Sequence, residues 1–365
     1  MKAAILGFGR MGEHVLQALR DMPEISRVIA YDVDPLRRDP ALRLGADFSP
    51  SLDAVLRDPE VRLVFITSPN HTHSRLAGRA LRAGKAVLLE KPIAETFRKS
   101  RHVVELAEEL GTYLQIGFEL RYSHLYRWVK DAIETGQIGS VVGVDCRYLC
   151  SEFHGKGSWR NDPATGGGMF AEKLCHYIDL PRWWLSDEIE CVASFSAPNV
   201  VPYFQVRDNY RAIYRFAGGA AASIHFVMYS ASAFAGDPLQ NTVSQQLDDG
   251  HELRFLVTGS CGALETDVFR RRFRRWEFTD SPKGLISRLV ETKSWPEDAD
   301  HFHFHNTTAQ AQDCVRRVLR GLPPAIAPMD ALATMAAVEA TEKSTDAGRM
   351  IRPGSLRSRS PACGK

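Results

Sequence analysis

The feature that most constrains this chain is a glycine-rich motif, GFGRMG, that starts at residue 7. It directly follows an apolar run at residues 3–6 and opens a stretch, residues 12–20, whose apolar positions recur with helical spacing. A strand, a tight glycine turn and a helix in this order are typical of a dinucleotide-binding βαβ unit, in which the helix N-terminus faces the phosphates. We therefore expect the loop to hold the diphosphate of a dinucleotide. The residues of this predicted phosphate loop are Gly7, Phe8, Gly9, Arg10, Met11 and Gly12.

An acidic residue after the next predicted strand favours NAD as the cofactor. Asp32 lies 20 residues after Gly12, where a carboxylate accepts hydrogen bonds from the ribose hydroxyls of the adenosine. The same charge repels the 2′-phosphate of NADP, although Arg37 and Arg38 follow closely and can accommodate that phosphate. The alternative is a glycine turn that merely joins a strand to a helix.

Strand and helix patterns alternate up to about residue 122 and change after it. Short apolar runs separated by helix-period stretches predict a doubly wound parallel sheet, the α/β fold of a Rossmann domain. The runs occupy residues 3–6, 27–31, 63–66, 86–89 and 113–116, and the clearest helices occupy residues 12–20 and 97–110. From about residue 141, longer alternating segments joined by glycine-containing turns predict a C-terminal α/β domain with a large, open, mostly antiparallel sheet.

The second region divides into predicted strands and helices as follows. The strands span residues 141–149, 211–216, 221–228, 252–258 and 264–278, and residues 208–229 read as a hairpin that turns at Gly218 and Gly219. The helices span residues 124–135, 169–185, 307–320 and 330–347. We expect an NAD-binding Rossmann domain at residues 1–122, a substrate-binding and oligomerisation domain at 123–352, and an unfolded Ser/Arg-rich tail at 353–365.

Composition restricts the partners and the compartment. The 365 residues carry 46 Lys and Arg against 44 Asp and Glu, so the net charge of +2 creates no field that selects nucleic acid or an acidic membrane. No apolar run approaches the ~20 residues of a membrane span, and the start MKAAILGFG contains no small-residue cleavage site. The seven cysteines include no CxxC pair, which indicates reduced thiols. We expect a cytoplasmic protein whose partner is a small molecule.

Three further motifs resemble those of one family. They are ITSPNHTHSRLA at residues 66–77, LLEKPIA at 88–94 and GGGMFAEKLCHYIDLPRWW at 166–184. Together with the glycine loop they resemble the glucose-fructose oxidoreductase / inositol dehydrogenase / rhizopine-catabolism (Gfo/Idh/MocA) family over about residues 1–350. The resemblance implies a Rossmann domain followed by an α/β domain whose open sheet carries the substrate site on one face. It implies an oligomer interface on the other face, in a homodimer or homotetramer, and oxidation or reduction at a secondary alcohol of a sugar or cyclitol.

The ends of two predicted strands place polar residues at the edge of the sheet where ligands bind. The cofactor-binding residues expected there are Ser68, Pro69, Asn70, His73, Glu90 and Lys91. Pro92 keeps Lys91 out of helical geometry and directs its ammonium into the cleft. A cation there polarises the substrate oxygen and stabilises a developing alkoxide, so we expect Lys91 to be catalytic. Taken without its motif, a lysine before a loop is usually solvated.

A histidine in the third motif is the expected base. Glu172 and His176 lie four residues apart on one face of the predicted helix, and Asp179 and Trp183 continue that face. The imidazole takes the alcohol proton as the hydride leaves, and Glu172 orients the imidazole or relays its proton. A pair at this spacing also occurs as a purely structural hydrogen bond. Glu172 stands where the family usually has Asp, and the residues KLC that follow it replace a more apolar, glycine-containing run, so the substrate stays open.

Three other residues enter through the resemblance. Trp159 and Arg160 resemble family residues that reach toward the cofactor and substrate. Arg121 matches a family position near the domain junction. We expect all three to contact the cofactor.

Two residue clusters have more than one interpretation. His301, His303 and His305 share one face if the chain is extended there, which is compatible with a zinc site, but we favour a polar loop lining the substrate cleft and expect no metal. The segment FRRRFRRWEF at residues 269–278 carries five arginines that superficially suggest nucleic acid. We favour a solvated or interface strand, with an anionic substrate or a partner subunit's acidic patch as alternatives. Cys175 is interpreted as a small buried residue rather than a nucleophile.

The sequence therefore predicts an NAD-dependent dehydrogenase that oxidises a secondary hydroxyl of a cyclitol or sugar, inositol-like or pyranose, by hydride transfer to nicotinamide. One alternative is transient oxidation at C3 of a glycoside followed by elimination of the aglycone, without net redox. Another is a regulator that binds dinucleotide without catalysis. Lys91, Glu172 and His176 together favour an enzyme, because a sensor needs the glycine loop but no acid–base set.

Overall fold

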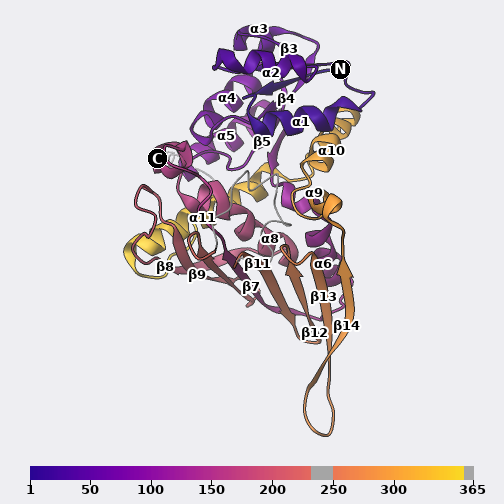
Figure 1. Cartoon of the computed structure of the whole chain (residues 1–365), viewed down its shortest axis with the longest axis vertical. Helices are drawn as coiled ribbons and strands as arrows, with labels where there is room; N and C mark the ends of the chain where they lie inside the picture. Colours follow the sequence, from indigo (N-terminus) through magenta and orange to yellow (C-terminus); the bar gives the residue numbers. More distant parts are fainter. Residues whose placement is uncertain (232–249, 357–365) are drawn as a thin grey trace, which may run out of the picture.

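The computed structural model describes residues 1–231 and 250–356, and its first sheet has six parallel strands (Figure 1). These are β1 (Lys2–Leu6), β2 (Arg27–Tyr31), β3 (Asp47–Phe48), β4 (Val61–Ile66), β5 (Ala86–Glu90) and β6 (Leu114–Gly117). Their order is β3-β2-β1-β4-β5-β6. Because the order reverses between β1 and β4, the carboxyl ends of these strands open a crevice in which α/β sheets bind ligands.

Helices cover both faces of this sheet because its central strands are apolar on both faces. Ala3 and Ile5 of β1 pack with α1, whereas Ala4 and Leu6 pack with α4. The helices that follow the strands are α1 (Arg10–Arg20), α2 (Arg38–Arg43), α3 (Leu52–Arg57), α4 (Asn70–Arg82) and α5 (Phe97–Leu110). The doubly wound parallel sheet predicted from the alternation is confirmed, and β3 is a strand that the pattern did not predict.

The second sheet has eight strands and is mostly antiparallel, as predicted. They are β7 (Val141–Leu149), β8 (Ile189–Phe195), β9 (Asn209–Phe216), β10 (Ala221–Val227), β11 (Glu252–Gly259), β12 (Gly262–Asp267), β13 (Arg272–Thr279) and β14 (Ile286–Ser294). Their order is β14-β13-β12-β11-β7-β10-β9-β8, and β7 and β10 are the parallel pair. The predicted hairpin is confirmed, since β9 and β10 pair antiparallel on either side of Gly218 and Gly219.

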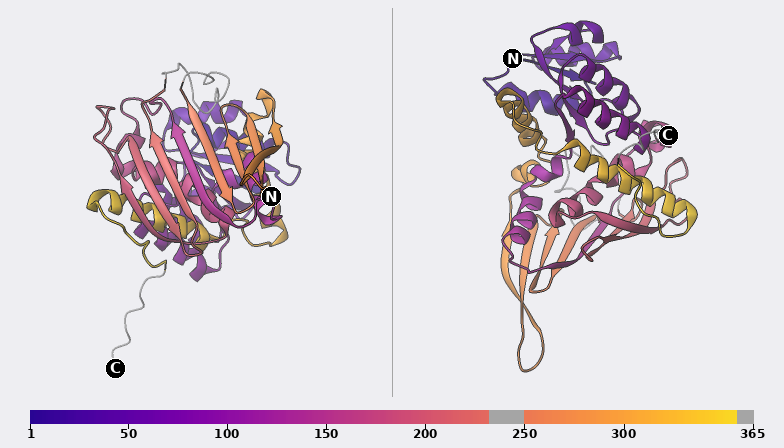
Figure 2. Two further views of the ribbon diagram at one scale, coloured as in Figure 1. Left: turned by 90° about the horizontal axis from the view of Figure 1, so that it is seen from below. Right: turned by 180° about the vertical axis from the view of Figure 1, so that it is seen from behind.

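One face of the second sheet is covered and the other is open. The helices α6 (His124–Glu134), α8 (Cys175–Leu185) and α11 (Pro328–Ala347) lie between this sheet and the Rossmann domain (Figure 1). Seen from below, the strands lie in front of these helices, and no described helix crosses them (Figure 2). The β13–β14 hairpin extends away from the rest of the molecule (Figure 1).

Two predicted elements of the second region are wrong in detail. The segment 264–278 is not one strand, because the chain turns between β12 and β13 at Arg271, whose φ is 47°. The helix predicted at 169–185 begins with a π-helical segment, η4 (Phe170–Leu174), and becomes an α-helix only at Cys175. β8 and β14 are strands that the sequence analysis did not predict.

The chain returns to the Rossmann domain near its end. The helix α10 (Thr307–Arg320) buries Ala311, Cys314 and Val315 in the same apolar cluster as Ile5 of β1. The domain boundary at residue 122 remains a proposal. The helix α10 belongs to the second domain by its residue numbers but packs against the Rossmann domain. Of the tail predicted as unfolded, residues 357–365 lie outside the described residues.

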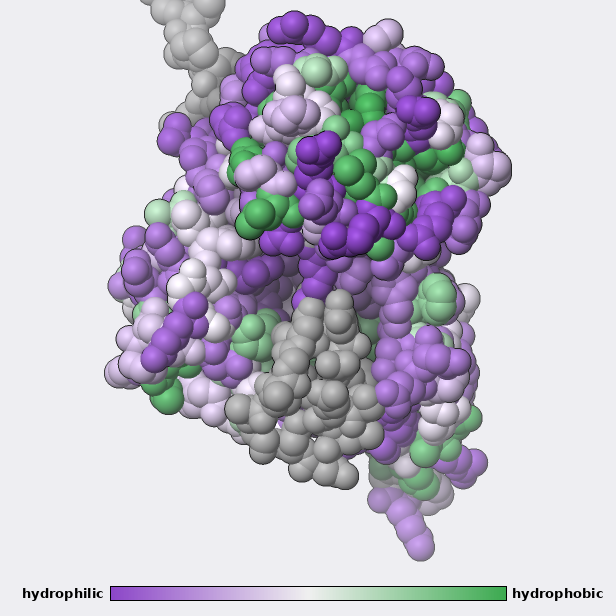
Figure 3. All heavy atoms as spheres, turned by 45° about the horizontal axis from the view of Figure 1, so that its top comes forward, coloured by the Kyte–Doolittle hydropathy of each residue, from purple (hydrophilic) through white to green (hydrophobic). Residues whose placement is uncertain are grey.

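Surface and helix properties add two facts. No helix in residues 1–231 and 250–356 is long and apolar enough to cross a membrane. On the face shown in Figure 3, hydrophilic residues dominate the waist between the upper and lower lobes.

Candidate active site

The glycine loop leaves open space where a diphosphate fits. A Cβ on Gly7, whose φ is 98°, would lie 2.6 Å from Cα of Ser68, and a Cβ on Gly12 would lie 2.6 Å from the carbonyl oxygen of Gly7. A Cβ on Gly9 would meet no described atom within 4 Å. Gly9 also precedes the first turn of α1, whose backbone N–H groups favour an anion. Two glycines are thus required by packing, and the third borders a space that fits the phosphates of a dinucleotide.

Asp32 is fixed by the same loop. Its Oδ2 accepts a hydrogen bond from the backbone N–H of Phe8 at 2.7 Å, and its Oδ1 accepts one from the N–H of Asp34 at 2.9 Å. A carboxylate oxygen can accept more than one hydrogen bond, so both oxygens can still receive ribose hydroxyls. Arg37 is exposed, and its Nε lies 3.7 Å from Asp34.

Arginines from both domains lie near the start of α1. Burial first, and then the positive charge of Arg160, lower the pKa of Arg10 to about 10. Arg160 belongs to a short 3-10 helix, η3 (Trp159–Asn161), of the second domain and stacks on the ring of Trp159 at 4.5 Å. The charge of Arg160 acts on Arg10 although Nε of Arg160 is paired with Glu172, and the cofactor contacts of both arginines stay predictions.

Two of the strand-end residues predicted to bind cofactor hold the backbone instead. Asn70 is buried, and its Nδ2 donates to the carbonyl of Gly166 at 2.8 Å, which ties α4 to the second domain. His73 is 1% exposed, and its ring nitrogens lie 2.7 Å from the carbonyl of Pro92 and 2.8 Å from that of Ser68. His73 is therefore occupied in joining the two strand ends. Ser68 and Pro69 remain at the crevice, where the Ser68 hydroxyl bonds that of Thr72 at 2.6 Å.

Lys91 connects the end of β5 to the second domain. Its Nζ donates to the backbone carbonyl of Glu172 at 2.7 Å, and its peptide bond with Pro92 is cis. Burial lowers the pKa of Lys91, but the neighbouring acidic groups, Glu172 first among them, outweigh burial and hold that pKa above its ordinary value. Lys91 is therefore a permanent cation beside the third motif.

Glu172 does not contact the histidine that it was predicted to orient. Its Oε1 accepts from Nε of Arg160 at 2.9 Å, and its Oε2 lies 3.5 Å from Nε2 of His154. Burial alone would raise the pKa of Glu172, but His154, Lys91 and Arg160 hold it well below its usual range. The physical reason for the altered partner is the π-helical segment, whose wider turn removes the i,i+4 alignment of an α-helix.

His176 instead faces a different carboxylate. It is 4% exposed, and its Nε2 lies 3.4 Å from Oε2 of Glu119, a residue of the 3-10 helix η2 (Glu119–Tyr122). The other oxygen of Glu119 lies 2.8 Å from Nδ1 of His305. Burial lowers the pKa of His176 well below its ordinary value, so the ring is a neutral proton acceptor at physiological pH.

Glu90 is also buried at this end of the site. Its side chain packs on Gly117, where a Cβ would lie 2.8 Å from the carboxyl carbon, and it is 3.4 Å from Nε2 of Gln310. Burial, reinforced by the charge of Glu119, raises the pKa of Glu90 to about 8. Glu90 is therefore uncharged near neutral pH and is 6% exposed, which does not support its predicted contact with the cofactor.

Arg121 is committed to the protein itself. Its Nε and one terminal nitrogen each donate to Asp179 at 2.7 Å, and the other terminal nitrogen donates to Asp330 at 2.6 Å. The side chain is 8% exposed. Three of its five N–H donors thus bind two carboxylates that join η2, α8 and α11, and the contact of Arg121 with the cofactor stays a prediction.

The structure brings in Glu119, His154 and Lys173, which the sequence analysis did not select, and His305, which it assigned only to a loop lining the substrate cleft. Glu119 and His305 flank His176, His154 contacts Glu172, and the ammonium of Lys173 lies 3.9 Å above the ring of Phe153. Burial lowers the pKa of Lys173 to about 8. The run KLC at residues 173–175, which departs from the usual family pattern, could have drawn attention to Lys173. No local pattern marks Glu119, which is paired through tertiary contacts alone.

The three histidines near residue 303 point in different directions. The short helix α9 (Asp300–His303) replaces the extended chain that would align them. His301 contacts Thr308, His303 stacks on Trp295 at 4.8 Å, and His305 reaches Glu119. In the described part of the chain, no group of three or more His, Cys, Asp or Glu side chains is placed to hold a metal ion.

The arginine-rich strand is neutralised by acidic residues of the same chain. Arg270 pairs with Asp267, Arg271 with Asp300, and Arg275 with Glu277 and Glu291. Arg272 and Arg274 both pair with Glu265. These pairings agree with a strand on the sheet surface rather than a nucleic-acid site.

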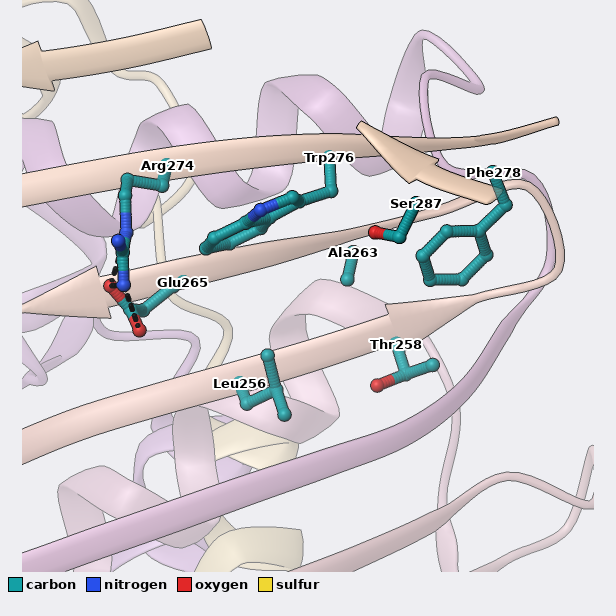
Figure 4. Close-up of a pocket in the computed structure, with 8 residues that line it drawn as sticks. All are labelled: Leu256, Thr258, Ala263, Glu265, Arg274, Trp276, Phe278 and Ser287. Atoms are coloured by element: carbon teal, nitrogen blue, oxygen red, sulfur yellow. Dashed lines mark hydrogen bonds and ion pairs between the residues drawn. The ribbon is translucent and has the colours of Figure 1, made fainter. Parts of the chain in front are cut away.

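A shallow cavity lies on the open face of the second sheet, and neither Lys91, Glu172 nor His176 lines it (Figure 4). Its volume is about 370 Å³. Trp276 lies flat across the strands, next to the ion pair of Arg274 with Glu265 (Figure 4). The cavity is lined by Leu256, Thr258, Ala263, Glu265, Arg274, Trp276, Phe278 and Ser287.

Known proteins with similar sequences and folds agree with this architecture. Residues 1–118 match the family described as "Oxidoreductase family, NAD-binding Rossmann fold", and residues 126–265 match the "GFO/IDH/MocA C-terminal domain". The chain is 26% identical over 282 residues to scyllo-inositol 2-dehydrogenase (NAD(+)) of Bacillus subtilis (strain 168), which covers 74% of this chain and 75% of that protein. It is 31% identical over 198 residues to inositol 2-dehydrogenase of Salmonella paratyphi B (strain ATCC BAA-1250 / SPB7), which covers 53% of this chain and 56% of that one.

Structural similarity extends over nearly the whole chain. Levoglucosan dehydrogenase in complex with NADH and L-sorbose superimposes with a TM-score of 0.82 at 20% identity, covering 98% of this chain and 99% of the other. At that identity the likeness concerns the fold. Several curated relatives are matched over only about half of their length, namely 55%, 58% and 54%. The two family matches together cover most of the chain, in the order of the two sheets, and the protein belongs to the Gfo/Idh/MocA oxidoreductase family.

Proposed function

We propose that this protein is a nicotinamide-dependent dehydrogenase that oxidises a secondary hydroxyl of a cyclitol or sugar. Among these substrate classes we favour inositol-like compounds. The observation that carries the proposal is the meeting of Lys91, at the carboxyl end of β5, with the backbone of Glu172, one turn before His176. A fixed cation and a neutral histidine thus converge where the sheet opens toward the nicotinamide end of a dinucleotide. The names of the inositol dehydrogenase relatives support the substrate class.

Each residue has a separate task in the proposed reaction. A nicotinamide cofactor, held by the glycine loop and Asp32, would supply the acceptor for the hydride of the carbinol carbon. Lys91 donates a hydrogen bond to the substrate oxygen and stabilises the negative charge that develops there. His176 accepts the hydroxyl proton, and its neutral resting state suits that role. Glu172 holds Arg160 and, through its backbone carbonyl, the ammonium of Lys91.

We propose NAD rather than NADP as the cofactor. The support is Asp32, whose carboxylate is held in place by two backbone N–H groups where an adenosine ribose would lie. A 2′-phosphate at that position would meet a fixed negative charge. Arg37 lies on the exposed side of the same loop and is the group through which NADP would bind if the preference were reversed.

The test is a panel of inositols, amino-cyclitols, free hexoses and glycosides, each mixed with purified protein and either NAD or NADP. We expect reduced-cofactor fluorescence with NAD and at least one polyol. Protein that binds NAD and yields no fluorescence with any compound would contradict the dehydrogenase proposal. Release of an aglycone from a glycoside without NADH would then favour the redox-neutral route, and its absence would favour a regulator.

We also propose that the open face of the second sheet contacts a second copy of this chain in a homodimer or homotetramer. The support is the cavity around Trp276 and apolar side chains on that face such as Ile213, which is 61% exposed. Burial of such surface would favour association by roughly 25 cal/mol per Å². We expect Trp276→Glu to lower the molar mass measured by light scattering while leaving the far-ultraviolet circular dichroism unchanged. An unchanged molar mass above that of the monomer would place the interface elsewhere.

A further inference from the structure

We propose that Glu119 and His305 form the path by which the proton taken up at His176 leaves the buried site. The inference rests on the proposed dehydrogenase function, because oxidation of an alcohol by NAD releases one proton per turnover. Its residues come from three separate elements: η2, the turn after α9, and α8. Glu119 and His305 are positioning residues in this scheme, since they act through His176.

One carboxylate bridges the two imidazoles. Oε2 of Glu119 lies 3.4 Å from Nε2 of His176, and Oε1 lies 2.8 Å from Nδ1 of His305. A contact of 2.8 Å is a hydrogen bond, and a proton can lie on either of its atoms. Among the described residues, both ring nitrogens of His176 and Oε2 of Glu119 are buried without a hydrogen-bond partner, so the 3.4 Å contact between them is a close approach of two unsatisfied groups. Buried polar groups of this kind are uncommon in folded proteins and call for a functional explanation.

Burial makes an exit path necessary. His176 is 4% exposed and Glu119 is 2% exposed, so a proton on this imidazole does not meet solvent directly. The side chain of His305 is 26% exposed and is therefore the member of the chain that reaches water. The contacts thus lead from the most buried group to the most exposed one.

The neighbouring ionisable groups are less suited to carry the proton. Lys91 is already a donor to the carbonyl of Glu172, and Glu172 is held by Arg160 and His154. Glu90 already carries a proton near neutral pH, because burial raises its pKa to about 8.

Charges from every side act on the two histidines. His176 faces Glu119 and Glu172, which favour its protonated form, and Lys91 and His305, which disfavour it. On its outer side, His305 also interacts with His301 and His14. Glu119 remains ionised, since His176, His305 and Lys91 lower its pKa despite burial.

The proton transfers balance as follows. The O–H bond of the substrate breaks and an N–H bond forms on Nδ1 of His176, while the C–H electron pair leaves as hydride to the nicotinamide. The Nε2–H bond of His176 then breaks, and the proton joins the carboxylate of Glu119. Glu119, now protonated, passes the proton to Nδ1 of His305 while that ring carries its hydrogen on Nε2, and the Nε2 proton passes to water. Tautomer exchange at both imidazoles, with no net gain or loss of protons, returns them to their starting forms. The products are a ketone, NADH and one proton in solution.

The test uses chemical rescue of the full-length protein. In His305→Ala, we expect kcat for polyol oxidation to fall about 100-fold, the lower end of proton-transfer contributions, with KM and the Kd of NAD unchanged. Added imidazole should restore kcat with saturation, because a small base can take the place of the exposed side chain. The matched control is His102→Ala, at an exposed position of α5, whose kcat should equal that of the wild type and be independent of imidazole.

Glu119 supplies the second comparison. Glu119→Gln should lower kcat at least as much as His305→Ala. Added imidazole should not restore its activity, because the missing carboxylate is buried. Glu119→Asp should recover part of the activity. A wild-type kcat in His305→Ala, or a loss that imidazole does not restore, would overturn the proposed path.

A readout without turnover separates this inference from the proposed function. If the wild type binds NAD but oxidises no polyol, the dehydrogenase proposal fails, and nitrogen-15 NMR of labelled histidine still tests the connection. We expect the His176 signal to shift as His305 titrates in the wild type and not in Glu119→Gln. Independent titration of the two histidines in the wild type would refute the connection.

Discussion

Two buried carboxylates lie near Lys91, and the protein holds them in different ways. Glu172 is held by Arg160 and His154, whereas Glu119 lies between the two imidazoles of His176 and His305. Glu172 thus has a guanidinium among its partners, which keeps its proton at any physiological pH, whereas both partners of Glu119 are imidazoles, which can gain and lose one. The difference suggests a division of tasks, in which the Glu172 end fixes charge and the Glu119 end moves protons.

The largest effect should come from the residue shared by both ends. We expect Lys91→Met to lower kcat by about two to four powers of ten, because the developing alkoxide loses its cation. The Kd of NAD, measured by quenching of protein fluorescence, should change little. The matched control is Lys343→Met, which removes an exposed lysine of α11. Equal activity of the two variants would contradict the role of Lys91.

A smaller effect, of a different kind, should follow at the Glu172 end. Glu172→Gln should lower kcat by up to about 100-fold, since Arg160 loses its charge partner while the carbonyl that binds Lys91 remains. Imidazole should not restore this loss, measured under the conditions used for His305→Ala. If imidazole restored the activity of Glu172→Gln, Glu172 and Glu119 would not differ in the proposed way.

The cofactor end provides the next prediction. Asp32→Ala should raise the Kd of NAD about tenfold to hundredfold, the cost of roughly 1.5–3 kcal/mol for a charge-assisted hydrogen bond. Discrimination against NADP should fall, since the repelling charge is gone, and kcat at saturating NAD should be nearly unchanged. Titration calorimetry measures both constants, and Asp39→Ala, at an exposed position of α2, is the control. An unchanged Kd would exclude Asp32 from the ribose site.

The smallest effect concerns stability and pH. The pKa of Glu90 is about 8 in the folded chain against an ordinary value of 4.5, so the folded state binds more protons between these values. Stability from this group is therefore fully present below about pH 4.5 and is lost as the pH rises through 8. We expect the urea midpoint of the wild type to fall between pH 5.5 and 8.5 more than that of Glu90→Gln. Parallel curves would show that Glu90 is ionised in the folded protein.

Much of the cofactor end could be predicted from the sequence because its signals are local. The glycine loop, Asp32 and Lys91 each stand at the end of an apolar strand, and parallel strands bring their carboxyl ends to one edge. The resemblance of the motifs to the family is confirmed by the family matches.

The Glu119 end could not be predicted, because it depends on tertiary contacts and on helix geometry. The Glu172–His176 pairing assumed an α-helix, and a π-helical segment changes which side chains align. Glu119 and His305 are 186 residues apart and share no motif. Similarly, the turn between β12 and β13 lacks the usual glycine signal, because Arg271 adopts a φ of 47° and is held there by Asp300.

The central claim is that hydride passes from a polyol carbon to a nicotinamide bound in this chain. The most direct measurement uses a polyol deuterated at its carbinol carbons, incubated with the protein and NAD, followed by mass spectrometry of the cofactor. With the wild-type protein we expect NADH that carries one deuterium on the nicotinamide. With Lys91→Met we expect unlabelled NAD. Unlabelled cofactor from wild-type protein shown to bind NAD, across the whole panel of polyols, would contradict the central claim.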